Sequence, residues 1–490
     1  PLGNYTQTLC HKDNATTGFL TVKRGTLKVA EQANYTALKS VNVDGGAFVV
    51  DSSAEVVFAA LETLAMEEGT TFEVTGNAGA TPFGSSSVNG KMGYGAKLKI
   101  AADKTLSFAR LEVVGTLPAA GTYTGSGYGT DGVTEVPWIE GAGRVTVSNA
   151  GIARTDWKAA VSGNWNDADN WTAGVPTADV EAFISAKGAD YTVTVDGTPT
   201  MPKRLVVAND DSHTATLSVE TSVSFTAAYL ELMNGGKITV PTNGDLLYSG
   251  RKGDGSRMMS SGAGYPIRVN AGGTLEVAGG AVTLTNVCGD VLLCGSGSKT
   301  GTVSVVSGRF YYGCDFNQEW SNADFFILNP QGAFLQSGGT ALFEHSKGGS
   351  TTVLQNRGGR ISVTGGTFGP VTERGGHKYA SYFNFGGGEN VFSGSAVYRT
   401  EHFFRLEPLT ADGEMHLVFK DQARLQCVGG DVNDQLAIGK RGRTYLGIYT
   451  DVCGTANFAT GAFVGYNGGE TELTIGEKGG SLTFERMKRK

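Results

Sequence analysis

Near the end of the chain, between Leu436 and Phe484, the sequence reads Ala437-Ile438-Gly439-Lys440-Arg441-Gly442 and then, 26 residues later, Phe463-Val464-Gly465-Tyr466-Asn467-Gly468. Each copy leads into an alternating apolar run, with Leu446 and Ile448 in the first and Leu473 and Ile475 in the second. A repeat of about 20–27 residues that combines period-2 strands with glycine turns is typical of a β-solenoid. One such coil buries its inward face only when it stacks on its neighbours.

Earlier parts of the chain show related coils. Gly338-Gly339 and Gly365-Gly366 are one repeat apart, and each pair precedes a short alternating strand. Paired glycines allow the positive φ angles that a coil needs where it turns. We therefore predict that most of residues 265–485 forms parallel coils, with the following side chains in the core: Leu275, Val277, Val303, Val305, Ile361, Val363, Leu473 and Ile475.

The composition agrees with a long, one-dimensional β fold. Glycine accounts for 73 of 490 residues and proline for only 12, which excludes collagen and a proline-rich linker. Hydrophobic residues make up 40%, which is too many for a disordered chain. The charged fraction is 18% and the net charge is −7, so the chain lacks the basic stripe of a nucleic-acid-binding protein.

The compartment is inferred from the same composition. No run of 18 apolar residues exists, so no membrane-spanning helix is expected. The chain begins at Pro1 rather than Met and shows no signal peptide, from which we expect a processed chain or a fragment. Low charge and abundant Thr, Ser, Gly and Asn favour an extracellular or cell-surface location.

Four of the six cysteines have the spacing of the coil. Cys288 and Cys314 are 26 residues apart, as are Cys427 and Cys453. Residues one coil apart stack about 4.8 Å from each other, which is within the Cα range of a disulfide. Each pair is either a disulfide or an unbonded pair of thiols in the core. The sequence has no Cys-x-x-Cys motif of a zinc or redox site.

Two motifs divide the chain near residues 150–156. The first is Leu117-Pro118-Ala119-Ala120-Gly121-Thr122-Tyr123 followed by the strand Ile139–Val147, and the second is Gly163-Asn164-Trp165 with Asn170-Trp171 and Gly174-Val175-Pro176. They resemble the closing segment and the opening segment of the β-helical passenger modules of autotransporter-like bacterial surface proteins. The opening motif has one extra residue between Asp179 and Ala182. The resemblance implies a β-helical module at residues 1–152 and a second, longer one at 153–490.

Three tryptophans cluster at the start of the second module. In the family that the motif resembles, tryptophans cap the first coil, and we expect that role for Trp157, Trp165 and Trp171. Clustered aromatic rings could also form a platform on which sugars stack. Covering the exposed end of a solenoid core is the commoner use, so we predict a structural role.

The sequence shows no recognisable active site. A pectin-type hydrolase of this fold would carry acidic and basic motifs on successive coils, and only Asp210-Asp211 resembles one of them. That pair follows Leu205-Val206-Val207 in a polar segment, which favours an exposed turn. Glu344-His345, Glu401-His402 and the segment Arg374–Lys378 are interpreted as loops or edges. We expect no enzyme activity, no cofactor and no metal site.

These observations predict an all-β chain of two tandem parallel β-helical modules, with right-handed coils. The expected function is that of an extracellular structural and adhesive rod, part of a large bacterial surface or secreted protein. Its expected partners are further β-helical modules, other copies of the chain in a head-to-tail fibre, glycans or surface proteins. The alternative is a carbohydrate-active β-helix, either a polysaccharide lyase or a glycan-binding module. A groove lined with acids and with Arg, Lys or His would favour that alternative.

Overall fold

The computed structural model of the chain describes residues 6–9, 18–67, 69–84, 88–93, 95–113, 121–124, 138–148, 153–210, 212–226, 228–250, 267–270, 272–285, 289–295, 299–313, 324–344, 351–371, 373–374, 377–378, 381–385, 387–400, 403–406, 414–428, 435–438, 443–450, 456–457, 462–464 and 470–475. The described chain is all-β, with long parallel sheets typical of a β-solenoid. It divides into two compact units between Ala153 and Arg154, one residue after the predicted boundary. We call them the N-terminal unit and the C-terminal unit.

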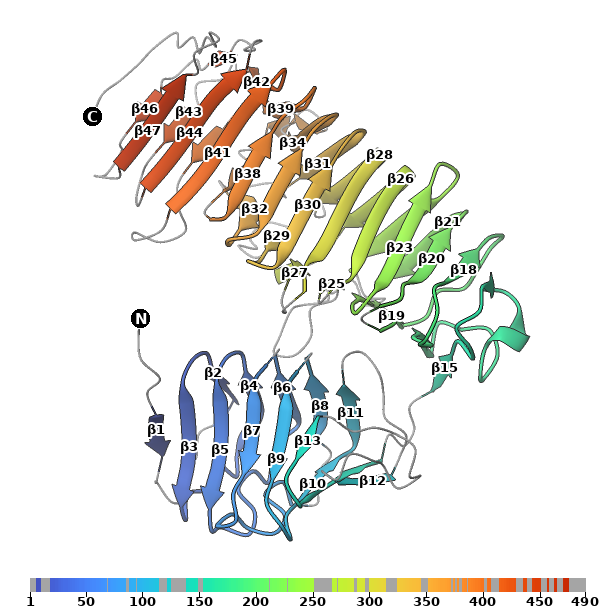
Figure 1. Cartoon of the computed structure of the whole chain (residues 1–490), viewed down its shortest axis with the longest axis vertical. Helices are drawn as coiled ribbons and strands as arrows, with labels where there is room; N and C mark the ends of the chain where they lie inside the picture. Colours follow the sequence, from blue (N-terminus) through green and yellow to red (C-terminus); the bar gives the residue numbers. More distant parts are fainter. Residues whose placement is uncertain are drawn as a thin grey trace. The chain divides into compact units, whose positions relative to one another are not determined.

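The N-terminal unit is built around two parallel sheets (Figure 1). Its six-stranded sheet has the order β1 (Thr6–Leu9), β3 (Thr26–Glu31), β5 (Ala47–Ser52), β7 (Thr71–Val74), β9 (Lys97–Ile100) and β13 (Ile139–Glu140). Its five-stranded sheet has the order β11 (Arg110–Val113), β8 (Asn89–Met92), β6 (Thr63–Met66), β4 (Leu38–Val43) and β2 (Gly18–Val22). Strands alternate between the two sheets along the chain, so each coil adds one rung to both.

Alternation along each strand determines which side chains enter the core of this unit. Phe48 and Phe72 are paired in register and fully buried, and their rings stack with centroids 5.4 Å apart. Val50 and Val74 form the next inward column, whereas Glu73, which lies between Phe72 and Val74 in β7, is on the other face of the sheet. Because the side-chain period of a strand is two, this register keeps every apolar column on the core side.

The end of the N-terminal unit departs from parallel pairing. A three-stranded sheet has the order β10 (Thr105–Phe108), β14 (Arg144–Val147) and β12 (Gly121–Thr124). β14 is parallel to β10, but β12 runs antiparallel to β14. The reversed strand pairs with backbone groups of β14 that would otherwise form an exposed edge. The segment predicted to close the first module thus contains the strand that ends this sheet.

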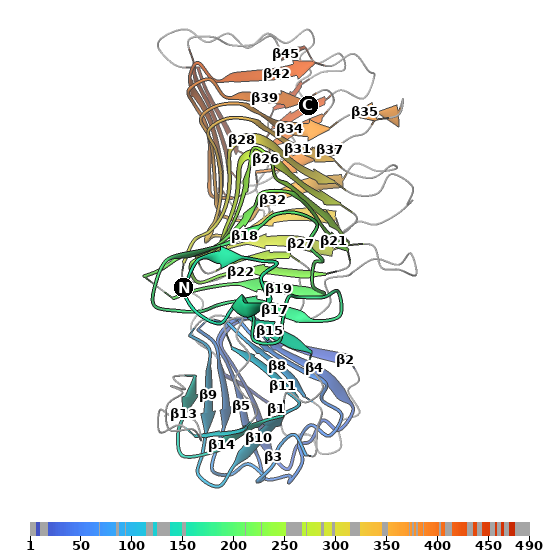
Figure 2. The same cartoon turned by 90° about the vertical axis from the view of Figure 1, so that its right-hand side faces the viewer.

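The C-terminal unit has two long parallel sheets (Figures 1 and 2). The nine-stranded sheet has the order β15 (Arg154–Asp156), β17 (Glu181–Ile184), β19 (Arg204–Val207), β22 (Tyr229–Leu232), β25 (Ile267–Val269), β27 (Gly289–Cys294), β29 (Asp324–Leu328), β32 (Thr351–Asn356) and β37 (Ser381–Asn384). Strands of later coils form a three-stranded sheet of β40 (Phe403–Leu406), β43 (Gln435–Ile438) and β46 (Ala462–Val464). A small antiparallel hairpin joins β35 (Glu373–Arg374) to β36 (His377–Lys378).

The nineteen-stranded sheet provides the other faces of the coil. Its strands are β16 (Gly163–Asn164), β18 (Tyr191–Val195), β20 (Ala215–Val219), β21 (Ser222–Thr226), β23 (Gly236–Pro241), β24 (Asp245–Ser249), β26 (Thr274–Thr285), β28 (Gly301–Gly313), β30 (Gly332–Gln336), β31 (Thr340–Glu344), β33 (Arg360–Val363), β34 (Thr367–Val371), β38 (Glu389–Phe392), β39 (Val397–Thr400), β41 (Glu414–Asp421), β42 (Arg424–Val428), β44 (Arg443–Thr450), β45 (Ala456–Asn457) and β47 (Glu470–Ile475). Most coils contribute two strands to it, and β26 and β28 each span both positions.

The predicted repeat is confirmed by the strand register. Ala437 pairs with Phe463 and Ile438 with Val464, while Leu446 pairs with Leu473 and Ile448 with Ile475. Six of the eight predicted core residues have described side chains, and all six are fully buried: Leu275, Val277, Val303, Val305, Ile361 and Val363. The parallel solenoid is therefore confirmed, whereas its right-handed sense stays a prediction.

A glycine corner recurs where the chain enters the nineteen-stranded sheet. A Cβ atom on Gly236 would lie 1.8 Å from the carbonyl oxygen of Val207, and one on Gly273 would lie 2.2 Å from that of Leu232. The amide of Gly273 also donates a hydrogen bond to the carbonyl of Asn270 at 2.7 Å. Successive coils approach so closely at this corner that only glycine fits there.

Candidate functional site

The first coil of the C-terminal unit contains three tryptophans. Trp157 follows β15, Trp165 follows β16, and Trp171 follows the 3-10 turn η1 (Ala168–Asn170). The indole of Trp171 lies edge-on to the other two, with ring centroids 5.0 Å from Trp165 and 5.2 Å from Trp157. Trp165 is 0% exposed, Trp171 is 1% exposed and Trp157 is 4% exposed. All three belong to the core that continues along this unit.

Local hydrogen bonds fix the loop that carries these rings. Asp167 Oδ1 accepts a hydrogen bond from the amide of Asp169 at 3.0 Å and begins the 3-10 turn. The Nε1–H of Trp171 donates to the carbonyl of Trp165 at 2.8 Å. The amide of Trp165 donates to Thr194 in the next coil, also at 2.8 Å. The ring cluster is thus tied both to itself and to the coil beside it.

This geometry bears on the two roles that were open for the cluster. A ring that stacks on a sugar needs one face open to solvent, and the indoles of Trp157, Trp165 and Trp171 are almost wholly buried. Their burial in the core of this coil agrees with the predicted capping role. The structural role stays a prediction, to be tested by substitution.

A buried ionic cluster on the nine-stranded sheet was not predicted. Arg204 in β19 lies 3.5 Å from a carboxylate oxygen of Glu181 in β17 and 2.9 Å from one of Glu231 in β22. The Arg204 guanidinium also lies 5.7 Å from the ring centroid of Phe183. Glu181, Arg204 and Glu231 are all at least nine-tenths buried. We call these three residues the ionic cluster.

The ionic cluster has the features of a structural contact. One arginine bridges two carboxylates from strands on either side, and Arg268 in β25 stands in register with Glu231. Burying a charge is costly unless it is paired and hydrogen-bonded, and here the pairing runs from coil to coil. The sequence does contain a signal for the cluster. Glu181 and Arg204 each begin a strand that is otherwise apolar, and the two residues pair in register.

A pair of buried amides was also missed. Asn356 and Asn390 are fully buried, and Asn356 Nδ2 donates to Asn390 Oδ1 at 2.8 Å. Asn390 Nδ2 donates in turn to the carbonyl of His416 at 2.8 Å. The oxygen of Asn356 accepts from the amide of Gly359 at 2.7 Å. These amides satisfy backbone groups where coils turn, which is a structural role.

Asp210 lies in a polar turn, as the sequence predicted. Its Oδ1 accepts from the amides of Ser212 and His213 at 2.9 and 3.0 Å, and it lies 2.8 Å from Nδ1 of His213. The hydrogen bond from the Ser212 amide, followed by that from the His213 side chain, lowers the pKa of Asp210 to about 2. This is the opposite of a carboxyl tuned to donate a proton at neutral pH. Asp211 lies outside the described residues.

The remaining polar candidates are mostly outside the described structure. His345, Glu401 and His402 fall outside it, as do Gly375 and Gly376 of the segment Arg374–Lys378. Within the part of the chain that is described, no group of three or more His, Cys, Asp and Glu residues could hold a metal ion. No helix among those residues is long and apolar enough to span a membrane.

The cysteine predictions also fall largely outside the described residues. Cys288, Cys314 and Cys453 are not described, and for Cys427 only the backbone is. Cys427 in β42 is in register with Ala456 of the following coil, three residues beyond Cys453. For both pairs, the two predicted alternatives, a disulfide or two unbonded thiols, therefore stay predictions.

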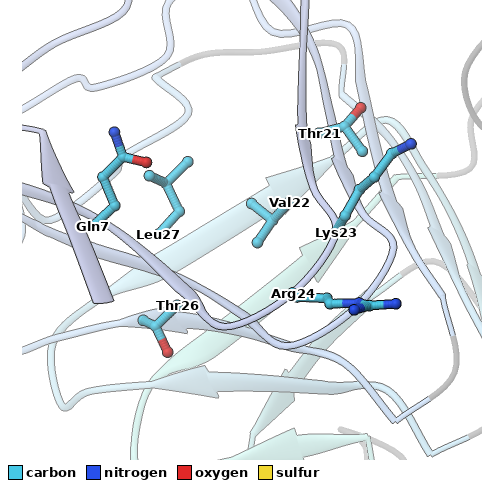
Figure 3. A pocket seen from close by; sticks show the side chains of 7 residues that line it. All are labelled: Gln7, Thr21, Val22, Lys23, Arg24, Thr26 and Leu27. Atoms are coloured by element: carbon cyan, nitrogen blue, oxygen red, sulfur yellow. The ribbon is translucent and has the colours of Figure 1, made fainter. Parts of the chain in front are cut away.

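The first coil of the N-terminal unit has an open pocket of about 470 Å³ (Figure 3). Val22 and Leu27 face it, with Gln7 on one side and the consecutive cations Lys23 and Arg24 on the other. The pocket lies in the coil that supplies β1 and β2. β1 is the terminal strand of the six-stranded sheet and β2 that of the five-stranded sheet.

Comparison with known proteins identified no relative of this chain. A scan against protein-family models found no matching family, and searches of curated proteins and of solved structures found no match.

Proposed function

We propose that the chain is an extracellular structural and adhesive β-solenoid, part of a large bacterial surface or secreted protein. It holds loops away from the cell and presents them to glycans or to other surface proteins. Three features of the chain support this proposal: the continuous parallel ladder, the paired buried charges, and the opening motif at Gly163–Trp171 that resembles passenger modules.

The observation that carries the proposal is the outward face of the nineteen-stranded sheet. One outward column runs through consecutive strands as Ser218, Thr239, Glu276, Ser304, Leu335, Ser362, Val391 and Val418. Glu276 is the charged member of this column, and it pairs with Lys237 at 2.7 Å and accepts from Thr239 at 3.0 Å. A polysaccharide lyase needs a carboxylate or metal cluster beside a proton acceptor. A column of hydroxyl and aliphatic side chains with a single charged residue suits a passive surface.

The proposal is tested on cells and on the purified chain. Antibodies against the chain should label intact producing cells, and their Fab fragments should reduce attachment of those cells to a surface coated with glycans or matrix proteins. Purified chain incubated with polygalacturonate and with a sulfated polysaccharide should release neither reducing ends nor unsaturated uronates. Polymer cleavage would instead support the carbohydrate-active alternative, and labelling only after cell lysis would contradict the surface location.

A further inference from the structure

Asn-Gly dipeptides occupy three different backbone settings within the described part of the chain. Asn89-Gly90 lies inside β8, which pairs with β6 on one side and β11 on the other. Asn234-Gly235 forms the corner between β22 and β23, and Asn243-Gly244 lies in the turn between β23 and β24. Glycine has no Cβ, so its backbone nitrogen is accessible to the side chain of the residue before it. The three dipeptides share this reactive sequence and differ in backbone conformation.

The corner at Asn234 is a tight turn with two left-handed residues. Asn234 has a φ of 51° and Gly235 a φ of 79°. The amide of Gly236 donates a hydrogen bond to the carbonyl of Met233 at 2.8 Å. Positive φ at both central residues is the requirement of a type I′ turn, for which Asn-Gly is the favoured pair. The hydrogen bond of the turn uses the Gly236 amide, so the Gly235 amide at the third position takes no part in it.

The side chain of Asn234 is not held by its carbonyl oxygen. Its Oδ1 is buried and accepts no hydrogen bond from any residue that the structure describes. Rotation of this side chain toward the Gly235 nitrogen therefore breaks no hydrogen bond of Oδ1. The Gly235 nitrogen is the nucleophile that an asparagine side chain in this position can meet.

The other two dipeptides hold the corresponding nitrogen differently. Gly244 is the fourth residue of its turn, and its amide donates to the carbonyl of Pro241 at 2.8 Å. Asn89 is exposed, but neighbouring strands on both sides keep the backbone of β8 extended. In both places the ring-closing movement works against hydrogen bonds of the fold.

We propose that the folded chain deamidates at Asn234 in preference to Asn243 and Asn89. The Gly235 nitrogen gives its proton to hydroxide and attacks Cγ of Asn234. The new N–Cγ bond closes a succinimide ring as the Cγ–Nδ2 bond breaks, and Nδ2 takes a proton from water and leaves as ammonia. Water then opens the ring at either carbonyl, which leaves aspartate or isoaspartate at this position.

The product affects the contact between two coils. The carbonyl of Asn234 accepts from the amide of Asn209 at 2.8 Å, and that of Gly235 accepts from the amide of Ala215 at 3.1 Å. Isoaspartate adds a methylene group to the backbone between these two carbonyls. The corner has no spare room for it, because a Cβ atom on Gly236 would already meet a backbone oxygen at 1.8 Å. Both inter-coil hydrogen bonds should therefore weaken when isoaspartate forms.

Incubation of the purified, folded chain at mildly alkaline pH tests the preference. Peptide mapping by mass spectrometry follows the amide-to-acid conversion at each dipeptide, and labelling by an isoaspartate methyltransferase identifies the isomer. Asn234 should convert at least about fivefold faster than Asn243, because the Gly244 amide must first release its hydrogen bond. Asn89 should be the slowest. In chain unfolded by urea, the three identical dipeptides should react at similar rates.

The variant Asn234→Gly is the matched control, since glycine tolerates the positive φ of this turn and carries no side-chain amide. It should fold as the wild type does and show no isoaspartate in this peptide. Hydrogen exchange at the amides of Asn209 and Ala215 should become faster in aged wild-type chain and stay unchanged in the aged variant. Conversion of Asn243 or Asn89 as fast as Asn234 in the folded chain would overturn the site. Unchanged exchange after conversion of Asn234 would overturn its effect on the coils.

Discussion

The two units end their parallel ladders in different ways. The N-terminal unit closes with β12, which runs antiparallel to β14 and supplies hydrogen-bonding groups to a strand edge. The C-terminal unit begins with three indoles in edge-to-face contact, which we predict to cover the apolar end of the first coil. A solenoid end exposes both backbone groups and core side chains. The strand β12 pairs with backbone groups, whereas the indoles are predicted to cover core side chains.

The largest effect is expected from removing the most buried of the three tryptophans. Trp165→Ala should lower the free energy of unfolding of the C-terminal unit by about 3–5 kcal/mol, because a fully buried indole leaves a cavity at the end of the core. Chemical denaturation followed by circular dichroism measures it. The control Val161→Ala, at a side chain that is 66% exposed in the same loop, should change stability by less than about 0.5 kcal/mol. Unchanged stability together with lost glycan binding would instead indicate a sugar platform.

A second substitution tests whether the stability of strands β17, β19 and β22 depends on the ionic cluster. Arg204→Ala leaves the buried carboxylates of Glu181 and Glu231 without their shared partner and should cost about 3 kcal/mol. The triple variant Glu181→Gln/Arg204→Met/Glu231→Gln removes all three charges and should recover most of that loss. If the triple variant is no more stable than the single one, the guanidinium stabilises the fold through packing rather than through pairing.

The antiparallel cap should be the weaker of the two. Tyr123 in β12 is 4% exposed, and its ring centroid lies 5.7 Å from that of Trp138. Tyr123→Ala should destabilise the N-terminal unit by about 2 kcal/mol, at the low end for a buried side chain because a terminal strand can relax into the space. Hydrogen exchange of the β14 amides measures it directly. A loss as large as that of Trp165→Ala would remove the distinction between the two caps.

The smallest effect is expected at a turn away from both caps. The folded-state pKa of Asp210 is about 2, below its ordinary value of 3.8, so its ionised form stabilises the fold above about pH 4. That contribution is lost as the pH falls from about 4 through 2. The wild-type melting temperature should therefore decline slightly more over this range than that of Asp210→Ala. Identical pH profiles would show that the turn hydrogen bonds do not depend on charge.

The sequence was most informative where chemistry repeats from coil to coil. Alternation at Leu275, Val277 and Ile361 predicted the core columns, because one strand face must be apolar throughout. It could not predict the reversal of β12, since Gly121–Thr124 would fit either direction of pairing. The ionic cluster was missed because charged residues are ordinarily solvated, and the burial of Arg204 depends on neighbours that single-strand patterns do not specify.

The ladder of the C-terminal unit has a mechanical consequence. Its interstrand hydrogen bonds join each coil to the next, so they run along the direction in which the coils stack. A pulling force on one end of this unit loads the bonds of the last coil before those of any other. The coils should then detach one after another, each releasing a short length of chain at modest force. A solenoid built this way should yield gradually under shear, and its remaining coils should keep their structure while the terminal ones detach.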